Sequence, residues 1–178
     1  DVSKTQVFYK VNHKNHEEVK GSAWIEITPC PVTIKANNAS KVYDAPEPAE
    51  FTATVSGKPG NGVPGNYSVA RVGGETAGTY DIIVTEGSNP NYTVTTEKGI
   101  FTIHKKGGVM SASVKDGGVD VVYDGNAHRI TVNVTCPDNG YTIEYKLPGG
   151  SYGATNPGKV NVSESGEVHY RVTHPNYN

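Results

Sequence analysis

Val32-Thr33-Ile34-Lys35 opens the stretch of sequence that decides the fold, residues 31–103, and Gly99-Ile100-Phe101-Thr102-Ile103 closes it. Between them lies the signature Val42-Tyr43-Asp44, which returns further along the chain as Val122-Tyr123-Asp124. Self-similarity at a fixed spacing is the sequence signature of repeat architectures. We therefore interpret the chain as a segment of a repeat array, in which this stretch is the complete unit and forms one compact body.

Two further motifs return in the flanking sequence. Asn89-Pro90-Asn91-Tyr92 returns as His174-Pro175-Asn176-Tyr177, and the closing strand has a counterpart in Ala23-Trp24-Ile25-Glu26-Ile27. Each flank carries only some of the signatures, so the chain should contain one complete and two partial repeats. We expect them in this order: residues 1–29, the C-terminal hairpin of a preceding repeat; residues 30–104, a complete unit; residues 105–178, a unit lacking its last strand.

The composition fits small β-sandwiches and argues against several functional classes. Hydrophobic residues make up 35% of the 178 residues, while 21 Gly and 11 Pro supply many turns. The net charge of −2 provides no basic surface, so we expect no nucleic-acid partner. No apolar run approaches the length that spans a bilayer, so we expect no membrane insertion in this segment. Any export signal is expected outside residues 1–178.

Short runs of alternating apolar and polar residues predict β-strands throughout, and no window has a helical period. Such runs, separated by turns, are the pattern of an all-β sandwich. The prolines on both sides of Cys30 predict a stiff connector at 28–31. The expected strands are 6–11 and 22–28, then 32–36, 51–55, 67–72, 78–84, 92–95 and 100–103, then 110–114, 119–123, 129–135, 141–145, 159–162 and 168–172, with a loop at 58–65.

The motifs of the complete unit resemble a known family. Val42-Tyr43-Asp44, Gly78-Thr79-Tyr80, Asn89-Pro90-Asn91-Tyr92 and the closing strand at 100–103 are similar to the MBG repeats of bacterial surface proteins. The resemblance implies immunoglobulin-like β-sandwich repeats that are exported and arranged in tandem on large cell-surface adhesins. It brings no catalytic residues and no cofactor, so we do not expect an enzyme.

The flanks resemble the related YDG repeats. The similarity rests on residues 122–128, on residues 170–178 and on the hairpin at 9–27, in which His13-Lys14-Asn15-His16 replaces the usual Pro-Asn-Tyr. Together the two resemblances imply an extracellular location, on the cell wall or cell surface. They also imply that the partners are neighbouring repeats of the same polypeptide.

Three functions follow as alternatives. The first is a non-catalytic stalk or spacer that presents distal binding domains of a bacterial adhesin. The second is a module that binds host glycan or mucin, because the MBG name reflects mucin binding by some members. The third is a filament subunit whose copies assemble head to tail by strand complementation, because an unpaired sheet edge invites another strand. The incomplete ends would otherwise reflect a segment of a longer array.

Exposed aromatic rings and a closing strand are the candidate binding features. Tyrosines on strands could stack on sugar rings, and packing at the sandwich rim is the alternative. The residues of this ligand face are Tyr67, Tyr141, Tyr145 and Tyr152. The strand donor would use Trp24, Ile25 and Ile27, and we expect Trp24 to be packed, with its indole N–H paired.

The remaining candidates predict no cofactor and no catalytic site. Cys30 and Cys136 could form a disulfide in an oxidising compartment, although two cysteines are not a disulfide framework. The loop at 13–18 and the Asp-rich turns at 116–126 contain metal-ligand residue types, but a solvated loop and ordinary turns explain them better. No Ser-His-Asp or Cys-His grouping accompanies a nucleophile motif.

Overall fold

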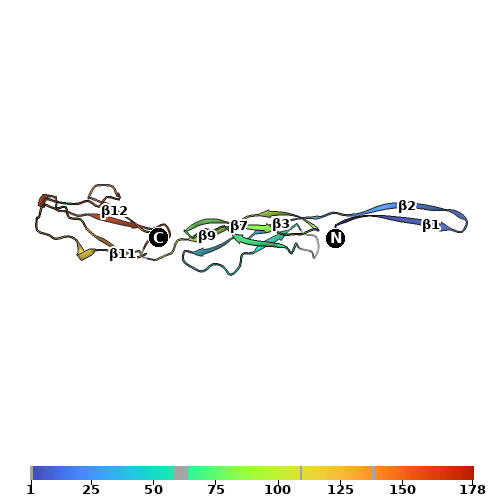
Figure 1. Cartoon of the computed structure of the whole chain (residues 1–178), viewed down its shortest axis with the longest axis horizontal. Helices are drawn as coiled ribbons and strands as arrows, with labels where there is room; N and C mark the ends of the chain where they lie inside the picture. The colour runs from blue at the N-terminus through green and yellow to red at the C-terminus, as the bar shows by residue number, and fades with distance from the viewer. Residues whose placement is uncertain (1, 58–63, 109, 138) are drawn as a thin grey trace. The chain divides into compact units, whose positions relative to one another are not determined.

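The computed structural model describes residues 2–57, 64–108, 110–137 and 139–178. This part of the chain forms strands β1 to β13 and two short 3-10 turns, with no α-helix among the described residues (Figure 1). The prediction of an all-β, sandwich-like fold is confirmed. Of the loop expected at 58–65, residues 58–63 lie outside the described part.

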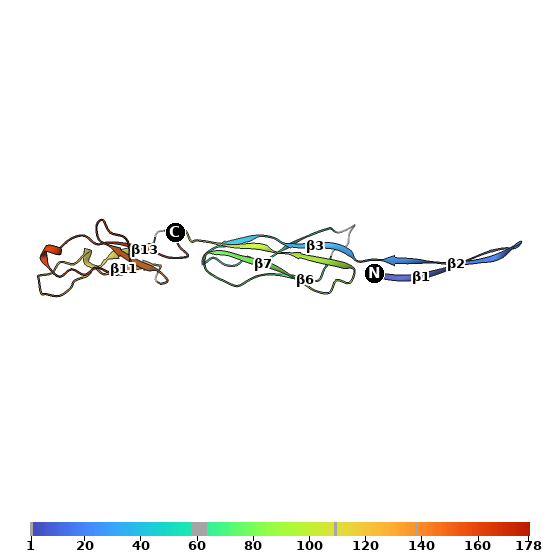
Figure 2. The ribbon, with the colours of Figure 1, turned by 90° about the horizontal axis from the view of Figure 1, so that it is seen from above.

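The N-terminal residues form a two-stranded antiparallel ribbon of β1 (Ser3–His13) and β2 (His16–Ile27). No third strand pairs with this ribbon among the described residues, as both views show (Figures 1 and 2). The two strands extend further than the alternating runs predicted. The ribbon is therefore a hairpin without a partner sheet, a structure that is only marginally stable in water.

The two faces of this ribbon differ in character, because residues directly opposite each other on antiparallel strands share a face. One face is mixed polar and aromatic and is called the polar face below; its opposed pairs include Lys4–Glu26, with 2.9 Å between Nζ and Oε2, Gln6–Trp24 and Phe8–Ser22, and the side-chain amide of Gln6 donates to the Ser22 hydroxyl. The other face is largely apolar, and its opposed pairs are Ser3–Ile27, Thr5–Ile25, Val7–Ala23, Tyr9–Gly21 and Val11–Val19. This apolar face is exposed to solvent.

Two sheets make up the central sandwich. A three-stranded sheet has the order β5 (Ala53–Ser56), β3 (Cys30–Ala36), β8 (Tyr92–Glu97). A four-stranded sheet has the order β4 (Ala39–Val42), β9 (Gly99–His104), β7 (Gly78–Glu86), β6 (Tyr67–Arg71). Strand β3 begins earlier than expected, within the stretch predicted as a connector. Pro31 is tolerated there because the pairing of β3 with β5 begins only at Thr33.

The buried core comes from alternate residues of β3, β7 and β9. Its apolar members are Val32, Ile34, Ala36, Ile82, Phe101 and Ile103. The ring of Phe51 packs edge-on against Phe101, with 5.5 Å between ring centroids. Burying one such side chain stabilises a fold by about 1.5–3 kcal/mol. The closing strand β9 thus contributes two of the residues on which the sandwich depends.

The C-terminal residues form two antiparallel pairs. Strand β10 (Ser111–Val114) pairs with β11 (Val132–Cys136), and β12 (Thr142–Lys146) pairs with β13 (His169–Thr173). The strands expected at 119–123 and 159–162 do not form; Lys159 makes only an isolated bridge to His128. A strand requires a neighbouring strand to satisfy its N–H and C=O groups, and residues 119–123 have none among the described residues.

By its internal contacts the chain divides into two compact units. The first contains Asp1–Ser40, Glu47–Gly74 and Thr79–Thr102, and the second contains Lys41–Pro46, Glu75–Gly78 and Ile103–Asn178. The expectation that the Tyr43 and Phe101 regions share one compact body is therefore wrong. Tyr43 groups with the second unit because its ring packs against His174 and Tyr177.

Candidate functional site

Asn176, in the second Pro-Asn-Tyr loop, accepts one hydrogen bond on its side-chain oxygen and one on its backbone carbonyl oxygen. It is buried, and its side-chain Oδ1 accepts a hydrogen bond of 2.7 Å from the backbone N–H of Ala77. Its carbonyl oxygen accepts a second bond, of 2.8 Å, from the backbone N–H of Lys106. All three residues belong to the second unit. One asparagine thus holds two backbone segments that are far apart in sequence.

Asn91, at the matching place in the first Pro-Asn-Tyr loop, makes the same pair of bonds. Its Oδ1 accepts from the backbone N–H of Val2 at 3.0 Å, and its carbonyl accepts from the N–H of Cys30 at 2.9 Å. Cys30 follows Ile27 by three residues, as Lys106 follows Ile103. The two arrangements are therefore equivalent in sequence and in geometry. We call Asn91 and Asn176 the joint asparagines.

The loop around Asn176 is further fixed by packing among three aromatic rings, those of Tyr43, His174 and Tyr177. His174 is buried, and its Nδ1 accepts the backbone N–H of Asn176 at 3.0 Å, so this ring nitrogen carries no proton. Tyr177 packs edge-on against His174 at a centroid distance of 4.9 Å, and Tyr43 lies 6.0 Å from Tyr177. Edge-on rings at such distances attract each other through their quadrupoles.

An ion pair closes the same cluster at the surface. Lys106 Nζ lies 2.9 Å from Asp44 Oδ2. The hydrogen bond and the charge of Lys106 lower the pKa of Asp44, and the same contacts raise the pKa of Lys106. Both side chains are exposed, so the pair contributes little to stability and mainly orients the two segments.

Sequence reasoning identified the Pro-Asn-Tyr motif but not the role of its asparagine. The signal was present, because the asparagine and the following tyrosine recur in both loops. What the sequence does not give is the distant amide that each Oδ1 accepts from, since that partner shares no local motif. The joint asparagines are the structural feature that the repeat pattern alone does not reveal.

The four predicted ligand-face tyrosines are divided between the two units. Tyr67 begins β6 in the first unit, whereas Tyr141, Tyr145 and Tyr152 belong to the second. Tyr145 on β12 lies opposite Tyr170 on β13. Strand alternation places the neighbouring pair Glu144–Arg171 on the other face of these strands.

Tyr152 lies among charged side chains. Its ring has Arg171 Cζ at 4.5 Å and Lys146 Nζ at 4.9 Å from the centroid, and Arg171 is also bonded to Glu144 at 2.6 Å. Cations over an aromatic ring are attracted to its negative face. Tyr152 is thus engaged in a local cation–π cluster, and sugar stacking by these tyrosines stays a prediction.

The predicted strand donor is exposed in the ribbon. The exposed fractions are 60% for Trp24, 56% for Ile25 and 50% for Ile27. The expectation that Trp24 is packed is wrong. Trp24 corresponds in sequence to Ile100 of the central sandwich, which is also exposed, and its ring lies 5.6 Å from Lys4 Nζ on the polar face of the ribbon. Register, and not residue size, decides which side chains of a closing strand are buried.

The remaining candidates are accounted for as follows. Cys30 and Cys136 are both free cysteines, and the Cys30 thiol points to the carbonyl oxygens of Pro31 and Gly57. No group of three or more His, Cys, Asp or Glu side chains in the described part of the chain could hold a metal ion. Within the same residues, no helix is long and apolar enough to cross a membrane.

The turn considered for calcium is held by its own hydrogen bonds. The backbone N–H of Asn126 and the ring Nε2 of His128 each lie 2.8 Å from Asp124 Oδ1. The side-chain amide of Asn126 donates to Oδ2. Accepting these bonds, first of all the backbone one, lowers the pKa of Asp124 to about 2. Asp124 therefore serves as the acceptor that shapes this turn.

Comparison with known proteins gives one match, and it covers most of the central sandwich. The family model of the MBG domain (YGX type) matches residues 32–102. The chain has no significant match among curated proteins or among solved structures. The prediction of an MBG-type repeat in the middle of the chain is confirmed by this match, and residues 32–102 are similar to MBG domains of the YGX type.

Proposed function

We propose that the chain is a stalk or spacer of a bacterial surface adhesin, which holds distal binding domains away from the cell envelope. The observation that carries the proposal is the repeated joint. Two asparagines at equivalent positions, Asn91 and Asn176, each accept one bond on Oδ1 and one on the backbone carbonyl. A spacer needs every repeat to be joined to the next in the same way, and a recurring pair of bonds provides this.

Other features of the joints favour stiffness over free rotation. The entry segment of the first joint contains Pro29 and Pro31, whose rings fix their φ angles. The second joint adds the ion pair of Lys106 with Asp44. A flexible linker is rich in Gly and Ser and behaves as a random coil; the first joint segment, 28–31, has neither residue, whereas Gly107 and Gly108 follow Lys106 in the second. A row of packed repeats with such joints holds a distal domain away from the cell envelope, and this function requires no catalytic activity.

A surface-display experiment tests this function. The chain is placed between a cell-surface anchor and a reporter binding domain, and it is compared with a Gly-Ser linker of the same number of residues. We expect the reporter to reach a bulky immobilised ligand better on the chain than on the linker. The double variant Asn91→Ala, Asn176→Ala should lose part of this advantage. Equal access with the chain and the flexible linker would rule out the spacer function.

A further inference from the structure

Two segments of the central sandwich run side by side in the same direction. Strand β3 pairs in parallel with β8, in a register that sets Cys30 opposite Tyr92 and Lys35 opposite Glu97. The backbone N–H of Cys30 also donates to the carbonyl oxygen of Asn91 at 2.9 Å. The contact between the two segments therefore begins at the first joint asparagine and continues along the whole of β8.

The contact continues where both segments cross into the other sheet, as β4 and β9. At the crossing, the side-chain Oδ1 of Asn38 accepts the backbone N–H of Ile100 at 2.8 Å. These two residues are 62 apart in sequence, the same offset as between the partners in β3 and β8, so the register is kept through the crossing. Gly99 is buried there, and a Cβ atom on it would lie 2.7 Å from the carbonyl oxygen of Ala36. Only glycine lets the two backbones approach so closely.

The chain continues on both sides of these paired segments, which we define as residues 30–38 and 91–100 of the first unit. It enters the first segment from residues 1–29 and leaves the second through the end of β9 into residues 105–178. Tension along the chain therefore pulls the first segment at its N-terminal end and the second at its C-terminal end. Because the two segments are parallel, the pulls act in opposite directions along one line of contacts, and the load on these contacts is shear.

Shear loads all contacts between two strands at the same time. Hydrogen bonds in a parallel pair are evenly spaced along the strands, so sliding one strand past the other breaks them together, whereas peeling from one end breaks them in turn. Sliding β3 would also uncover Val32 and Ile34, which are 3% and 0% exposed, and exposing buried apolar side chains to water is unfavourable. For both reasons, the sandwich should resist tension along the chain more strongly than a pull that peels the two strands apart.

We propose that the paired segments form a mechanical clamp, which keeps the central sandwich folded under tension along the chain. The clamp gives the sandwich a load-bearing function in addition to the spacing of distal domains. It rests on the proposed spacer function only for the source of the tension, because a stalk is pulled when the domain that it presents is held. Resistance to force is measured separately from reach. Weak resistance with good reach in the display experiment would remove the clamp and leave the spacer, and the opposite result would do the reverse.

The test pulls on the full chain in two directions in an optical trap. Two introduced cysteines carry the DNA handles, after Cys30 and Cys136 are replaced by Ser. In the axial geometry the handles are attached at Thr28→Cys and Lys105→Cys, one on each side of the paired segments. In the peeling geometry they are attached at Thr28→Cys and Ser88→Cys, which precede the two segments at the same end. All three attachment positions are exposed.

The two geometries should differ in the force at which the sandwich unfolds. At the same pulling speed, the axial force should exceed the peeling force by about twofold or more, because the contacts of a parallel pair share the load in shear and break in turn in peeling. Circular dichroism verifies that both labelled chains are folded. Equal forces in the two geometries overturn the proposal, as does a lower force in the axial one.

Two neighbouring asparagines test whether the contacts between the segments carry the load. Asn38→Ala removes the acceptor of the Ile100 N–H and should lower the axial unfolding force. Asn37→Ala is the matched control, because the Asn37 side chain bonds to Thr52 and Thr54, outside the paired segments, and its axial force should stay at the wild-type value. Both asparagines are exposed, so both variants should fold. An axial force that Asn38→Ala leaves unchanged, or that both variants lower equally, contradicts the clamp.

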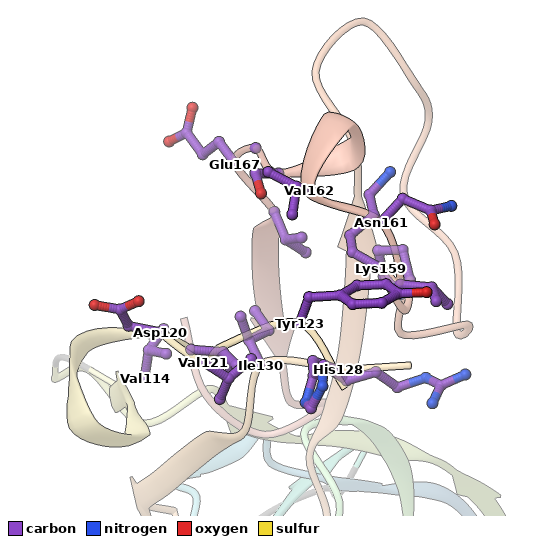
Figure 3. A pocket seen from close by; sticks show the side chains of 18 of the residues that line it. Val114, Asp120, Val121, Tyr123, His128, Ile130, Lys159, Asn161, Val162 and Glu167 are labelled. Carbon is purple, nitrogen blue, oxygen red and sulfur yellow. The ribbon is translucent and has the colours of Figure 1, made fainter. Parts of the chain in front are cut away.

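The cavity of the second unit supplies a control that involves neither segment. It has a volume of about 540 Å³, and its lining combines apolar side chains such as Val121 with charged ones such as Lys159 and Glu167 (Figure 3). Val162→Ala changes a residue of this lining that is 75% exposed, and it should leave the axial force unchanged. A loss of force in Val162→Ala as large as the loss in Asn38→Ala would mean that the force reports general destabilisation, and it would overturn the clamp.

Discussion

At the scale of single residues, the joint asparagines show how one side chain sets a local structure. An Asn side-chain oxygen can accept a backbone N–H without a charge and without the long side chain of Gln, whose extra rotatable bond costs entropy. Asn176 is buried and its hydrogen bond with the Ala77 amide is partly buried, so water can replace this acceptor only in part. Leaving a buried donor unpaired costs about 1–3 kcal/mol.

We therefore predict that Asn176→Ala lowers the free energy of unfolding by about 1–3 kcal/mol, through the unpaired Ala77 N–H. Denaturant unfolding followed by tyrosine fluorescence measures the change. Asn178→Ala is the control, because Asn178 is exposed in the same loop and should change stability by less than about 0.5 kcal/mol. Equal stabilities of the two variants would contradict the role given to Asn176.

The lowered pKa of Asp124 leads to a prediction about how the stability of its turn depends on pH. Its folded pKa is about 2, below the ordinary aspartate value of about 3.9, because it accepts bonds from Asn126 and His128. A depressed pKa means that the carboxylate contributes to stability above the ordinary value, and that this contribution is lost as pH falls toward the folded value. The turn at 124–128 should therefore loosen between about pH 4 and pH 2. The carboxyl carbon shift of Asp124 in an NMR titration measures the midpoint, and a midpoint near 4 would refute the assignment.

At the scale of elements, patterns with a local cause were predictable from the sequence. Alternation on β3 and β9 indicated strands with one buried face, and Phe101 and Ile103 are buried as that pattern requires. The run at 119–123 has the same β-branched character and forms no strand. The difference is the neighbour: β4 has β9 beside it, and residues 119–123 have no strand beside them in the described part. Composition cannot supply that information.

Trp24 was mispredicted for a similar reason. A large aromatic residue in a closing strand suggests a buried anchor, yet the register places Trp24 on the polar face with Lys4 and Glu26. The comparison with exposed Ile100 would have indicated the correct face. The joint asparagines were missed because their partners, Val2 and Ala77, lie far away in the sequence. Long-range partners of a motif need coordinates.

The ribbon of β1 and β2 leads to a prediction about the rate of amide hydrogen exchange. Because β1 and β2 have no partner sheet among the described residues, their amide hydrogens should exchange far faster than those of β3 and β9. Hydrogen–deuterium exchange by mass spectrometry makes the comparison. The joint with Val2 should limit the effect at the base of the ribbon. Protection of the ribbon tip equal to that of β9 would contradict the view of an unsupported hairpin.

At the scale of the whole molecule, the chain shows the same joint twice, once at Asn91 and once at Asn176. Each joint lies inside one compact unit: Val2, Cys30 and Asn91 in the first, Ala77, Lys106 and Asn176 in the second. The match of residues 32–102 to the MBG domain fits such a chain of modules. The spacer account requires that the joints, and not only the sandwiches, keep a fixed geometry in solution.

Pulsed electron paramagnetic resonance measures that geometry most directly. Spin labels are attached at Thr95→Cys and Ser151→Cys, two exposed positions in different units, after Cys30 and Cys136 are replaced by Ser. Mixing the labelled chain with an excess of unlabelled chain excludes distances between copies. The account predicts one narrow distance distribution, which Asn176→Ala broadens and Asn178→Ala leaves unchanged. A distribution that is already broad with Asn176 in place would contradict it.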